Sequence, residues 1–194
     1  MAEERPTVQP DTIRRIVYRE ISNADRLKFT ARSNRAATGG GARDIRFRPY
    51  TKFGDVFSRL FPETRTERTK ANPSETIFVG KFNWLESGAL REMESKFVPP
   101  NDSRDTEGRL TQVNKYPCFT NLPDGNEGMV LLLLIQDANG SVWPVFATEK
   151  SLGDPGWNRD VADKILNCIN AKRSRTAVAG YMDFETGQEF CNGK

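Results

Sequence analysis

The sequence predicts a mainly β fold of the α+β class, arranged as a barrel or a sandwich. Short runs rich in β-branched and aromatic residues are spread along the 194-residue chain, and only one or two segments show helical spacing. Strands and helices do not alternate in a βαβ rhythm, which argues against a parallel sheet. A chain of this length can bury a sizeable core in one domain. We therefore expect one domain over residues 12–194, after a flexible N-terminus of residues 1–11.

Two strands separated by a long loop are expected before residue 50. Residues 13–21 place apolar side chains among arginines and predict a strand, with a helix as the alternative because the alternation is imperfect. Residues 23–41 are basic and rich in Ser, Asn and Gly, which predicts a loop of a length that is usually functional or disordered. Residues 44–49 alternate polar and apolar side chains and end at a proline, which predicts a half-buried strand.

The middle of the chain predicts a helix followed by a strand between polar segments. Residues 52–61 carry five apolar side chains at helical spacing and stop at a proline, so we expect a helix whose apolar stripe packs in the core. Residues 63–74 are charged and predict a linker. Residues 76–85 predict a strand, followed by a polar and partly helical stretch to Lys96, and residues 101–115 form a second long polar segment.

The C-terminal third predicts a hairpin, a helix and a last strand. Residues 129–136 are almost all apolar and predict a buried strand, which a turn at 137–140 joins to a partner strand at 141–148. Asp160 is the expected N-cap of the helix that follows. Residues 181–190 are expected to add a last strand.

The absence of histidine excludes several classes of catalytic site. It removes Ser-His-Asp and Cys-His nucleophile sites, histidine-containing zinc sites and any imidazole general base. Cys118, Cys168 and Cys191 lie far apart without C-x-x-C spacing, so we expect reduced thiols rather than a disulfide framework. No apolar run approaches the ~20 residues that span a bilayer, and the N-terminus lacks a signal segment. We therefore expect a cytoplasmic protein with no membrane partner.

The net charge of +3 conceals an uneven distribution along the chain. Residues 1–70 contain 16 Lys and Arg against 9 Asp and Glu, a net of +7, whereas residues 71–194 contain 13 against 17, a net of −4. Positive charge concentrated in one third of a chain favours a partner rich in phosphate. The alternative is an ordinary solvated basic surface.

The first candidate binding segment is a glycine-rich stretch among arginines. Consecutive glycines after Thr38 allow close backbone approach and leave N–H groups that can bind phosphate. No Gly-Lys-Ser/Thr follows, which excludes a P-loop, and no βαβ unit surrounds it, which excludes a dinucleotide-binding fingerprint. The alternative is a disordered linker. We expect a basic arm that contacts DNA through Arg35, Thr38, Gly39, Gly40, Arg43 and Arg46.

The second candidate segment contains an acid and a base two residues apart. On an extended segment Glu107 and Arg109 point to the same face. Arginine can bind guanine O6 and N7 in the major groove while glutamate accepts from cytosine N4, so the pair can read one C·G base pair. Arg104 and Thr111 flank the pair and complete the set of candidate contacts. The alternative is an exposed ion pair of little energetic consequence.

Enzyme signatures are weak in this chain. Glu94-Ser-Lys96 supplies the E-x-K triplet of a PD-(D/E)xK nuclease, but no upstream aspartate is well placed to share Mg²⁺ with it. Ser87 has no base that could activate it, which excludes a serine hydrolase. We therefore expect no catalytic residue, cofactor or metal site, and keep a small Mg²⁺-dependent nuclease as an alternative.

The two segments together resemble a known family. Residues 37–41, Ala-Thr-Gly-Gly-Gly, precede a short strand and an amphipathic helix that ends Leu-Phe-Pro, and this order is similar to the N-terminal effector domain of EcoRII-type restriction endonucleases. Residues 107–111, Glu-Gly-Arg-Leu-Thr, are similar to the family's Glu-Lys-Arg-Ile-Thr segment, and the downstream hairpin also matches. The resemblance spans about residues 13–169.

The resemblance implies a DNA-binding pseudobarrel, like that of plant B-three domains, with one or two flanking helices. Two protruding arms, about residues 23–43 and 101–115, would grip the duplex from its major-groove side. Glu107 and Arg109 match the base-reading acid and arginine of the family, and Thr38, Gly39 and Gly40 match its first arm. The family's lysine between acid and arginine is replaced here by Gly108, and its Gly-Gly-His-Gln loop reads Gly-Gly-Gly-Ala-Arg. These departures bear on the target sequence more than on the mode of binding.

The implied function is sequence-specific recognition of a short, nearly palindromic site in double-stranded DNA. The chain would act as the effector domain of a type II restriction endonuclease, because the family's separate catalytic domain has no counterpart in these residues. Its other partner would then be a nuclease domain or a separate nuclease. Besides the Mg²⁺-dependent nuclease, the remaining alternative is a module that binds RNA or a phosphate-rich ligand.

Overall fold

A computed structural model describes residues 13–30, 43–68, 74–100, 106–119, 121–172 and 176–193. The predicted flexible N-terminus and most of the predicted first arm lie outside these ranges. The strands are β1 (Ile13–Glu20), β2 (Ile45–Phe47), β3 (Glu63–Glu67), β4 (Glu75–Glu86), β5 (Ala89–Val98), β6 (Gly108–Leu110), β7 (Val130–Asp137), β8 (Val142–Thr148), β9 (Ala179–Asp183) and β10 (Gln188–Cys191). The α-helices are α1 (Asn23–Thr30), α2 (Tyr50–Leu60) and α3 (Arg159–Asn170), and the short 3-10 helices are η2 (Val113–Lys115), η3 (Pro117–Phe119), η4 (Gly125–Glu127) and η5 (Ser151–Gly153).

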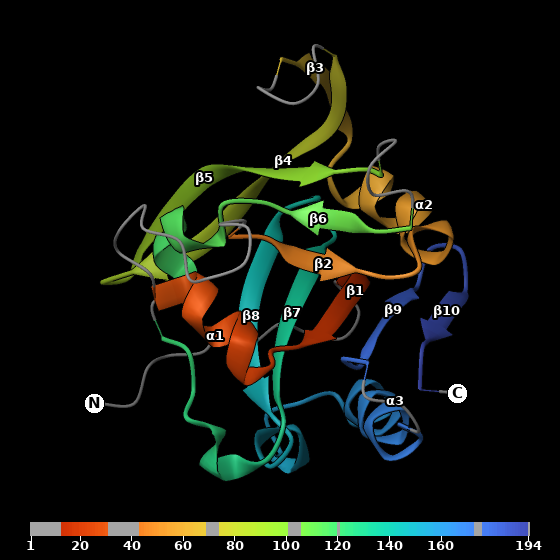
Figure 1. Cartoon of the computed structure of the whole chain (residues 1–194). Helices are drawn as coiled ribbons and strands as arrows, with labels where there is room; N and C mark the ends of the chain where they lie inside the picture. Colours follow the sequence, from red (N-terminus) through yellow and green to blue (C-terminus); the bar gives the residue numbers. More distant parts are fainter. Residues whose placement is uncertain are drawn as a thin grey trace.

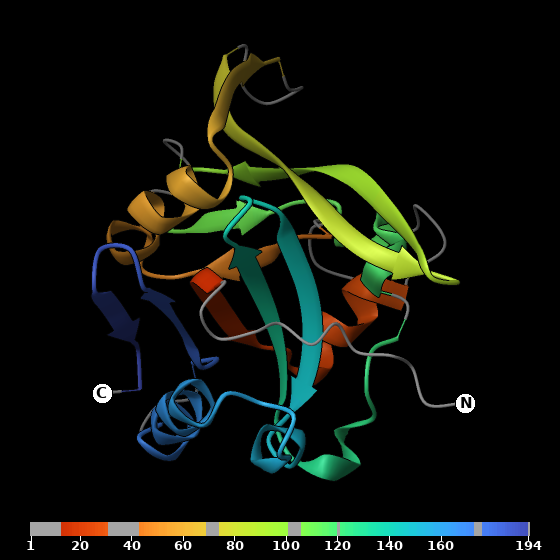
Figure 2. The same ribbon diagram turned by 180° about the vertical axis from the view of Figure 1, so that it is seen from behind.

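The strands form one curled sheet in the shape of a half-barrel (Figure 1, Figure 2). Their order is β10-β9-β1-β7-β8-β4-β5-β6-β2, and β3 pairs with β4 outside this path. Every pairing is antiparallel except a short parallel contact between β4 and β8. The predicted mainly β, α+β fold class is therefore confirmed. In the described part of the chain no helix is long and apolar enough to span a membrane.

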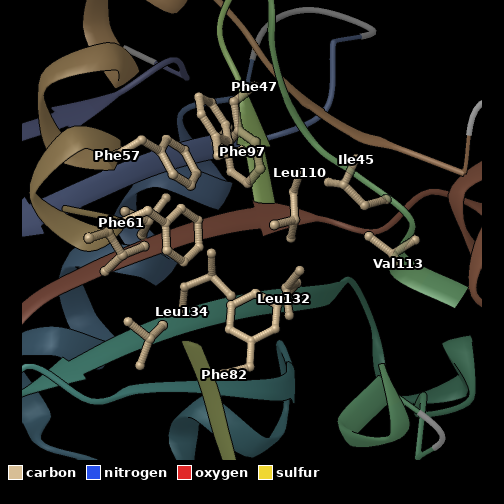
Figure 3. Packing of buried hydrophobic residues seen from close by; sticks show 14 of the residues in the cluster. Ile45, Phe47, Phe57, Phe61, Phe82, Phe97, Leu110, Val113, Leu132 and Leu134 are labelled. Atoms are coloured by element: carbon tan, nitrogen blue, oxygen red, sulfur yellow. The ribbon is translucent and has the colours of Figure 1, made fainter. Parts of the chain in front are cut away.

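Strand β7 is the centre of the fold because both of its faces are buried. Leu132 and Leu134 point into the aromatic-rich core inside the half-barrel (Figure 3). Leu131 and Leu133 point to the opposite face and pack beneath α3. A strand buried on both sides needs apolar side chains at every position, which explains the continuous run that predicted it. The predicted hairpin with β8 is also confirmed.

Helix α2 closes one end of the inner core, and its predicted apolar stripe is buried as expected. Phe53, Val56, Phe57 and Leu60 all lie inside. The ring of Phe57 stacks on Phe97 of β5 with 3.7 Å between ring centroids. This stacking fixes the helix against the outer strands of the half-barrel.

Helix α3 packs on the other face of the sheet, and its N-cap differs from the prediction. Asn158, not Asp160, occupies the cap, and its side-chain oxygen accepts a hydrogen bond from the Val161 amide at 3.1 Å. Asp160 instead lies in the first turn, where a negative charge still interacts favourably with the helix dipole.

Three segments that looked like loops, linkers or helix form regular structure of another kind. Residues 23–30, predicted as loop, are helix α1. At its start the Ser22 hydroxyl donates to the Asp25 carboxylate and accepts from the Asp25 amide, which stabilises the first turn. Residues 63–67, predicted as linker, are β3, which pairs with β4 through the main chain. Residues 89–98, predicted as partly helical, are β5, whose first six side chains are exposed and so show no alternation.

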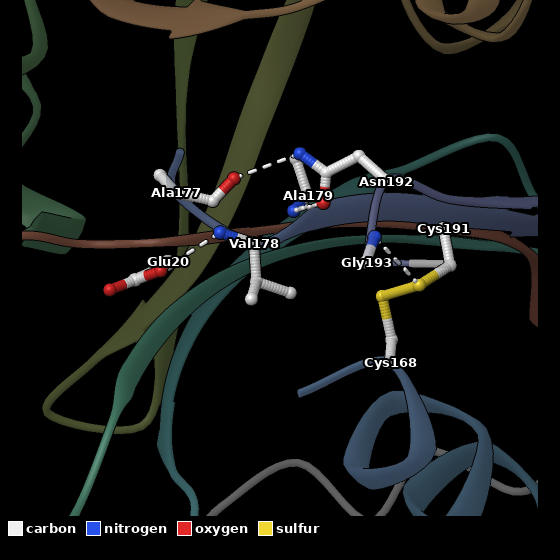
Figure 4. The surroundings of a disulfide bond; sticks show 8 residues. All are labelled: Glu20, Cys168, Ala177, Val178, Ala179, Cys191, Asn192 and Gly193. Carbon is white, nitrogen blue, oxygen red and sulfur yellow. Dashed lines mark hydrogen bonds between the residues drawn. A yellow bond between two sulfur atoms is a disulfide. The ribbon is translucent and has the colours of Figure 1, made fainter. Parts of the chain in front are cut away.

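Cys168 and Cys191 form a disulfide, which corrects the expectation of reduced thiols (Figure 4). The bond joins the buried face of α3 to the end of β10, with 5.8 Å between the Cα atoms. Only the fold brings these two residues together, since they lie 23 positions apart. Cys118 is free, and burial raises its pKa to about 12, so it stays an uncharged and weakly reactive thiol.

A Cys168→Ser variant should lose about 3 kcal/mol of unfolding free energy, because the disulfide restricts the unfolded chain over 23 residues. Urea denaturation of parent and variant without reductant measures the difference. Added dithiothreitol should lower the unfolding free energy of the parent to that of the variant and leave the unfolding free energy of the variant unchanged. Three reactive thiols in a denatured, non-reduced sample would show that the bond is absent.

A buried ion cluster joins β1 to α1. The Arg19 guanidinium donates to Asp25 Oδ2 at 2.8 Å, and Lys28 Nζ lies 2.6 Å from Oδ1 of the same carboxylate. Burial alone would raise the pKa of Asp25, but the two cations outweigh it and lower the pKa from 3.8 to about 2. One buried carboxylate is thus shared by two positive groups.

Because its pKa is depressed in the folded state, Asp25 should stabilise the fold above pH ~4 and lose that contribution as the pH falls towards about 2. An Asp25→Asn variant should therefore be less stable than the parent at pH 7, and the two should converge near pH 2. Denaturation across this range tests the effect. The control variant Asp163→Asn removes an exposed ion pair with Arg159, so its unfolding free energy should stay close to that of the parent at every pH.

Candidate functional site

The pairing of β2 with β6 brings together the two segments that the sequence marks as binding elements. Arg46 lies directly opposite Arg109 in this antiparallel pair, and Phe47 lies opposite Gly108. Ile45, Phe47 and Leu110 point into the core, so the alternate residues point outwards. The predicted half-buried strand at residues 44–49 is confirmed. We call the surface formed by Asp44, Arg46, Arg48, Glu107 and Arg109 the outer face of the β2–β6 pair.

The second predicted arm, residues 101–115, does not protrude over its described part, because it forms β6 and η2 with Leu110 and Val113 buried in the core. The described residues that border 31–42 and 101–105 lie at opposite ends of the β2–β6 pair. At one end the Val113 amide donates to the Arg43 carbonyl at 3.0 Å, and Arg43 is the first described residue after 31–42. At the other end the Tyr50 amide donates to the Thr106 carbonyl at 2.9 Å, and Thr106 is the first described residue after 101–105. The seven residue steps from Arg43 to Tyr50 separate the two ends by at most roughly 25 Å.

Glu107 is buried between two arginines. Its residue is only 3% exposed. Arg46 Nε lies 3.3 Å from Oε1, and Arg48 donates from both Nε and Nη2 to Oε2. A buried carboxylate needs such partners, because an uncompensated charge is costly away from water. Glu107 therefore positions the two arginines and leaves one net positive charge beside it.

Arg109 is held by a different pair of acids. Its side chain is 12% exposed, with Nη2 3.0 Å from Glu75 Oε1 and Nη1 3.7 Å from Asp44 Oδ2. Glu107 and Arg109 share a face, as expected, but each has other partners, so the exposed ion pair that was the alternative does not form between them. The two acids leave other N–H donors of the guanidinium for a base, although the Nε atom is buried.

Gly108 occupies a position that has no room for a side chain. A Cβ atom there would lie 2.2 Å from Cζ of Phe97. The strand alternation turns residue 108 towards the core, while Glu107 and Arg109 point outwards. The glycine that replaces the lysine of the similar family is thus required by the packing of Phe97.

The remaining predicted contacts fall into two groups. Arg35, Thr38, Gly39, Gly40 and Arg104 lie outside the described residues. Thr111 is half-buried, and its amide donates to the Lys96 carbonyl at 3.1 Å, which extends the pairing of β6 with β5.

Sequence reasoning counted Arg48 only among the arginines around the glycine-rich stretch, and it did not identify Asp44 or Glu75 as members of the site. The alternation of residues 44–48 carries a signal for the first two, because it places them on the same face as Arg46. Glu75 belongs to β4 and approaches Arg109 only through the fold, so no local pattern indicates it.

The nuclease alternative depends on Glu94 and Lys96, which lie on strand β5 rather than in the partly helical stretch expected. Arg65 Nη1 lies 2.8 Å from Glu94 Oε2, and Lys96 pairs with Glu67 of β3. Across the described ranges, no three Cys, Asp or Glu side chains gather where a metal ion could be held. The triplet is therefore part of an ion-pair network between β3 and β5.

Comparisons with protein-family models, with curated proteins and with solved structures find no match. The chain is thus a mainly β half-barrel that displays a charged two-stranded face between the starting points of two predicted arms. The resemblance to EcoRII-type effector domains remains a prediction.

A Glu107→Gln variant should be destabilised by roughly 1–3 kcal/mol, because it leaves two arginines without their shared carboxylate. Urea denaturation at pH 7 measures the loss. Glu92→Gln is a suitable control, since Glu92 pairs with Lys81 on the exposed face of β5 and should change stability by less than ~1 kcal/mol. Equal effects of the two substitutions would contradict a structural role for Glu107.

Proposed function

We propose that this chain binds double-stranded DNA in a sequence-specific manner, as the recognition domain of a type II restriction endonuclease. The observation that carries the proposal is the β2–β6 pair. It places Arg46, from the flank of the first predicted arm, opposite Arg109 of the second, although the two residues are far apart in the sequence. One face thereby unites the two segments that the sequence alone marks as DNA-binding.

The dimensions of this face suit a duplex. The arms would leave from ends at most roughly 25 Å apart, whereas the major groove is ~12 Å wide. Arms that flank the β2–β6 pair would therefore reach the two sides of a groove laid across it. The arginines between them would face the phosphates, whose neutralisation supplies much of the affinity for DNA.

The arginines on this face are held in place before any ligand binds. Glu107 fixes Arg46 and Arg48, and Glu75 with Asp44 fixes Arg109. A guanidinium held in one orientation loses less side-chain entropy when it binds a base or a phosphate. The same acids disfavour a wrong partner, because an arginine gives up an ion pair only for acceptors of matching geometry.

The proposal separates recognition from cleavage. Glu94 and Lys96 are engaged with β3, and the similar family carries its nuclease in a separate domain, so the partner that cuts would be another domain or another protein. No observation among the described residues specifically favours a metal-dependent nuclease or an RNA-binding module over duplex DNA.

Selection of bound oligonucleotides from a random duplex pool tests the proposal, with a short, nearly palindromic consensus as the expected result. Binding to that consensus should weaken steeply as salt rises, because phosphate contacts release counterions. Arg109→Ala should cost about 1–3 kcal/mol of binding and relax the preference at one base pair. Arg91→Ala, which removes an exposed arginine on β5, is the control and should bind like the parent.

Equal affinity for all duplexes at moderate salt would overturn the proposal. RNA that outcompetes duplex DNA would favour the RNA-binding alternative. Cleavage of a plasmid with Mg²⁺ that Glu94→Ala abolishes would favour the nuclease.

A further inference from the structure

A pocket of about 390 Å³ opens where the half-barrel fails to close. Strand β2 is the last strand at one end of the sheet order, and β9 and β1 lie near the other end. The curl of the sheet brings β2 close to β1 (Figure 1). The pocket lies between these two ends of the sheet, since residues from both line it. Its walls include Arg19, Arg46, Arg48, Ala177, Ala179 and Asn192.

The lining of the pocket has more positive than negative charge. Arg46 and Arg48 share the single carboxylate of Glu107. Arg19 shares the carboxylate of Asp25 with Lys28. Each cluster thus has one more cation than anion, and none of the described lining residues is acidic. A concave site with two surplus positive charges is stabilised by an anion.

The arginines keep hydrogen-bond donors for such an anion. Within the described part of the chain, Arg46 contacts Glu107 only through Nε, and Arg19 makes its contacts only through Nη1. A guanidinium has five N–H donors, so both side chains retain amino groups beyond these contacts. Arginine forks match the oxygens of a phosphate group with two parallel hydrogen bonds.

The wall that contains Ala177 and Ala179 is firmly held. Asn192 Oδ1 accepts from the Ala179 amide at 2.8 Å, and its Nδ2 donates to the Ala177 carbonyl at 2.9 Å (Figure 4). The preceding residue, Cys191, is bound to α3 through the disulfide. Arg19 belongs to the same wall, because it lies directly opposite Ala179 in the β1–β9 pairing, and Arg46 and Arg48 line the pocket from β2.

We propose that this pocket binds a phosphorylated ligand of mononucleotide size, with its phosphate against the arginines and its nucleoside against the alanine wall. The volume lies at the lower end of the ~300–1,000 Å³ of small-ligand sites and exceeds what a phosphate group alone would fill. The phosphate can come from a free nucleotide or from a DNA strand. The inference does not depend on sequence-specific DNA recognition, because it rests on the pocket and its charges.

The proposal is tested by titrating the full chain separately with adenosine 5′-monophosphate, inorganic phosphate and adenosine. NMR monitors each titration through the amide signals of Ala177 and Ala179. The monophosphate should shift both signals and bind at least ~10-fold more tightly than adenosine, which lacks the charge-assisted hydrogen bonds. Inorganic phosphate should bind more weakly than the monophosphate. Equal binding of phosphate and monophosphate would contradict a nucleotide-sized occupant.

Arg48→Gln should weaken binding of the monophosphate at least ~10-fold. Arg91→Gln is the matched control, because both arginine side chains are 54% exposed and each pairs with a glutamate. Unfolding curves of both variants establish that each is folded under the titration conditions. Equal loss of binding in the two folded variants, or no shift of the Ala177 and Ala179 signals with the monophosphate, would overturn the proposal.

A competition experiment identifies the source of the phosphate. Monophosphate that displaces a duplex would show that the pocket takes a DNA phosphate, whereas binding without displacement would show a free ligand, and either result supports the pocket. Duplex binding without any monophosphate binding would overturn the pocket and leave the DNA proposal intact. Binding of the monophosphate by a protein that shows no sequence preference for any duplex would support the pocket and overturn the DNA proposal.

Discussion

The packing of the Phe97 ring is the interaction on which the candidate site depends. The ring stacks on Phe57 of α2, approaches Phe47 of β2 and fills the space that a side chain at Gly108 would need. One aromatic side chain thus joins a helix to the three outer strands β5, β6 and β2. Burial of a large ring also supplies a substantial part of the driving force for their association. Because β2 and β6 contain only three residues each, side-chain packing must hold them where few ladder hydrogen bonds can.

Above this packed layer, shared carboxylates organise the positive charge. Glu107 and Asp25 are each contacted by two cations, and both acids are buried. A carboxylate with two cationic neighbours orients both of them, yet its single charge neutralises only one. The same arrangement therefore fixes the geometry of the arginines and preserves a net positive charge. Arg46 and Arg48 belong to both the outer face and the pocket, so an anion in the pocket would alter the charge that faces the proposed DNA.

The sequence predicts elements whose burial leaves a periodic or continuous pattern. The double-sided burial of β7, the stripe of α2 and the alternation around Phe47 each impose such a pattern, and each was predicted in place. The side chains of β3 and of the first six residues of β5 are mostly exposed. These strands are held by backbone pairing, which leaves no hydrophobic pattern in the sequence. The Cys168–Cys191 bond and the contact of Glu75 with Arg109 join segments that only the curl of the sheet brings together. Local spacing carries no information about such contacts.

The open seam of the half-barrel explains why charge and pocket occur together. A sheet that does not close leaves edge strands whose unpaired backbone groups can pair with another chain. Here the two terminal strands of the sheet order, β2 and β10, are three and four residues long. Arg46 and Arg48 add charge along the β2 edge, and Asn192 satisfies backbone groups near the β10 edge with its own side chain. Short edges, charge and side-chain capping are each means of preventing edge-to-edge association. At this seam they also produce a rigid concavity lined by arginines, so the features that protect the edge are the ones that would bind an anion.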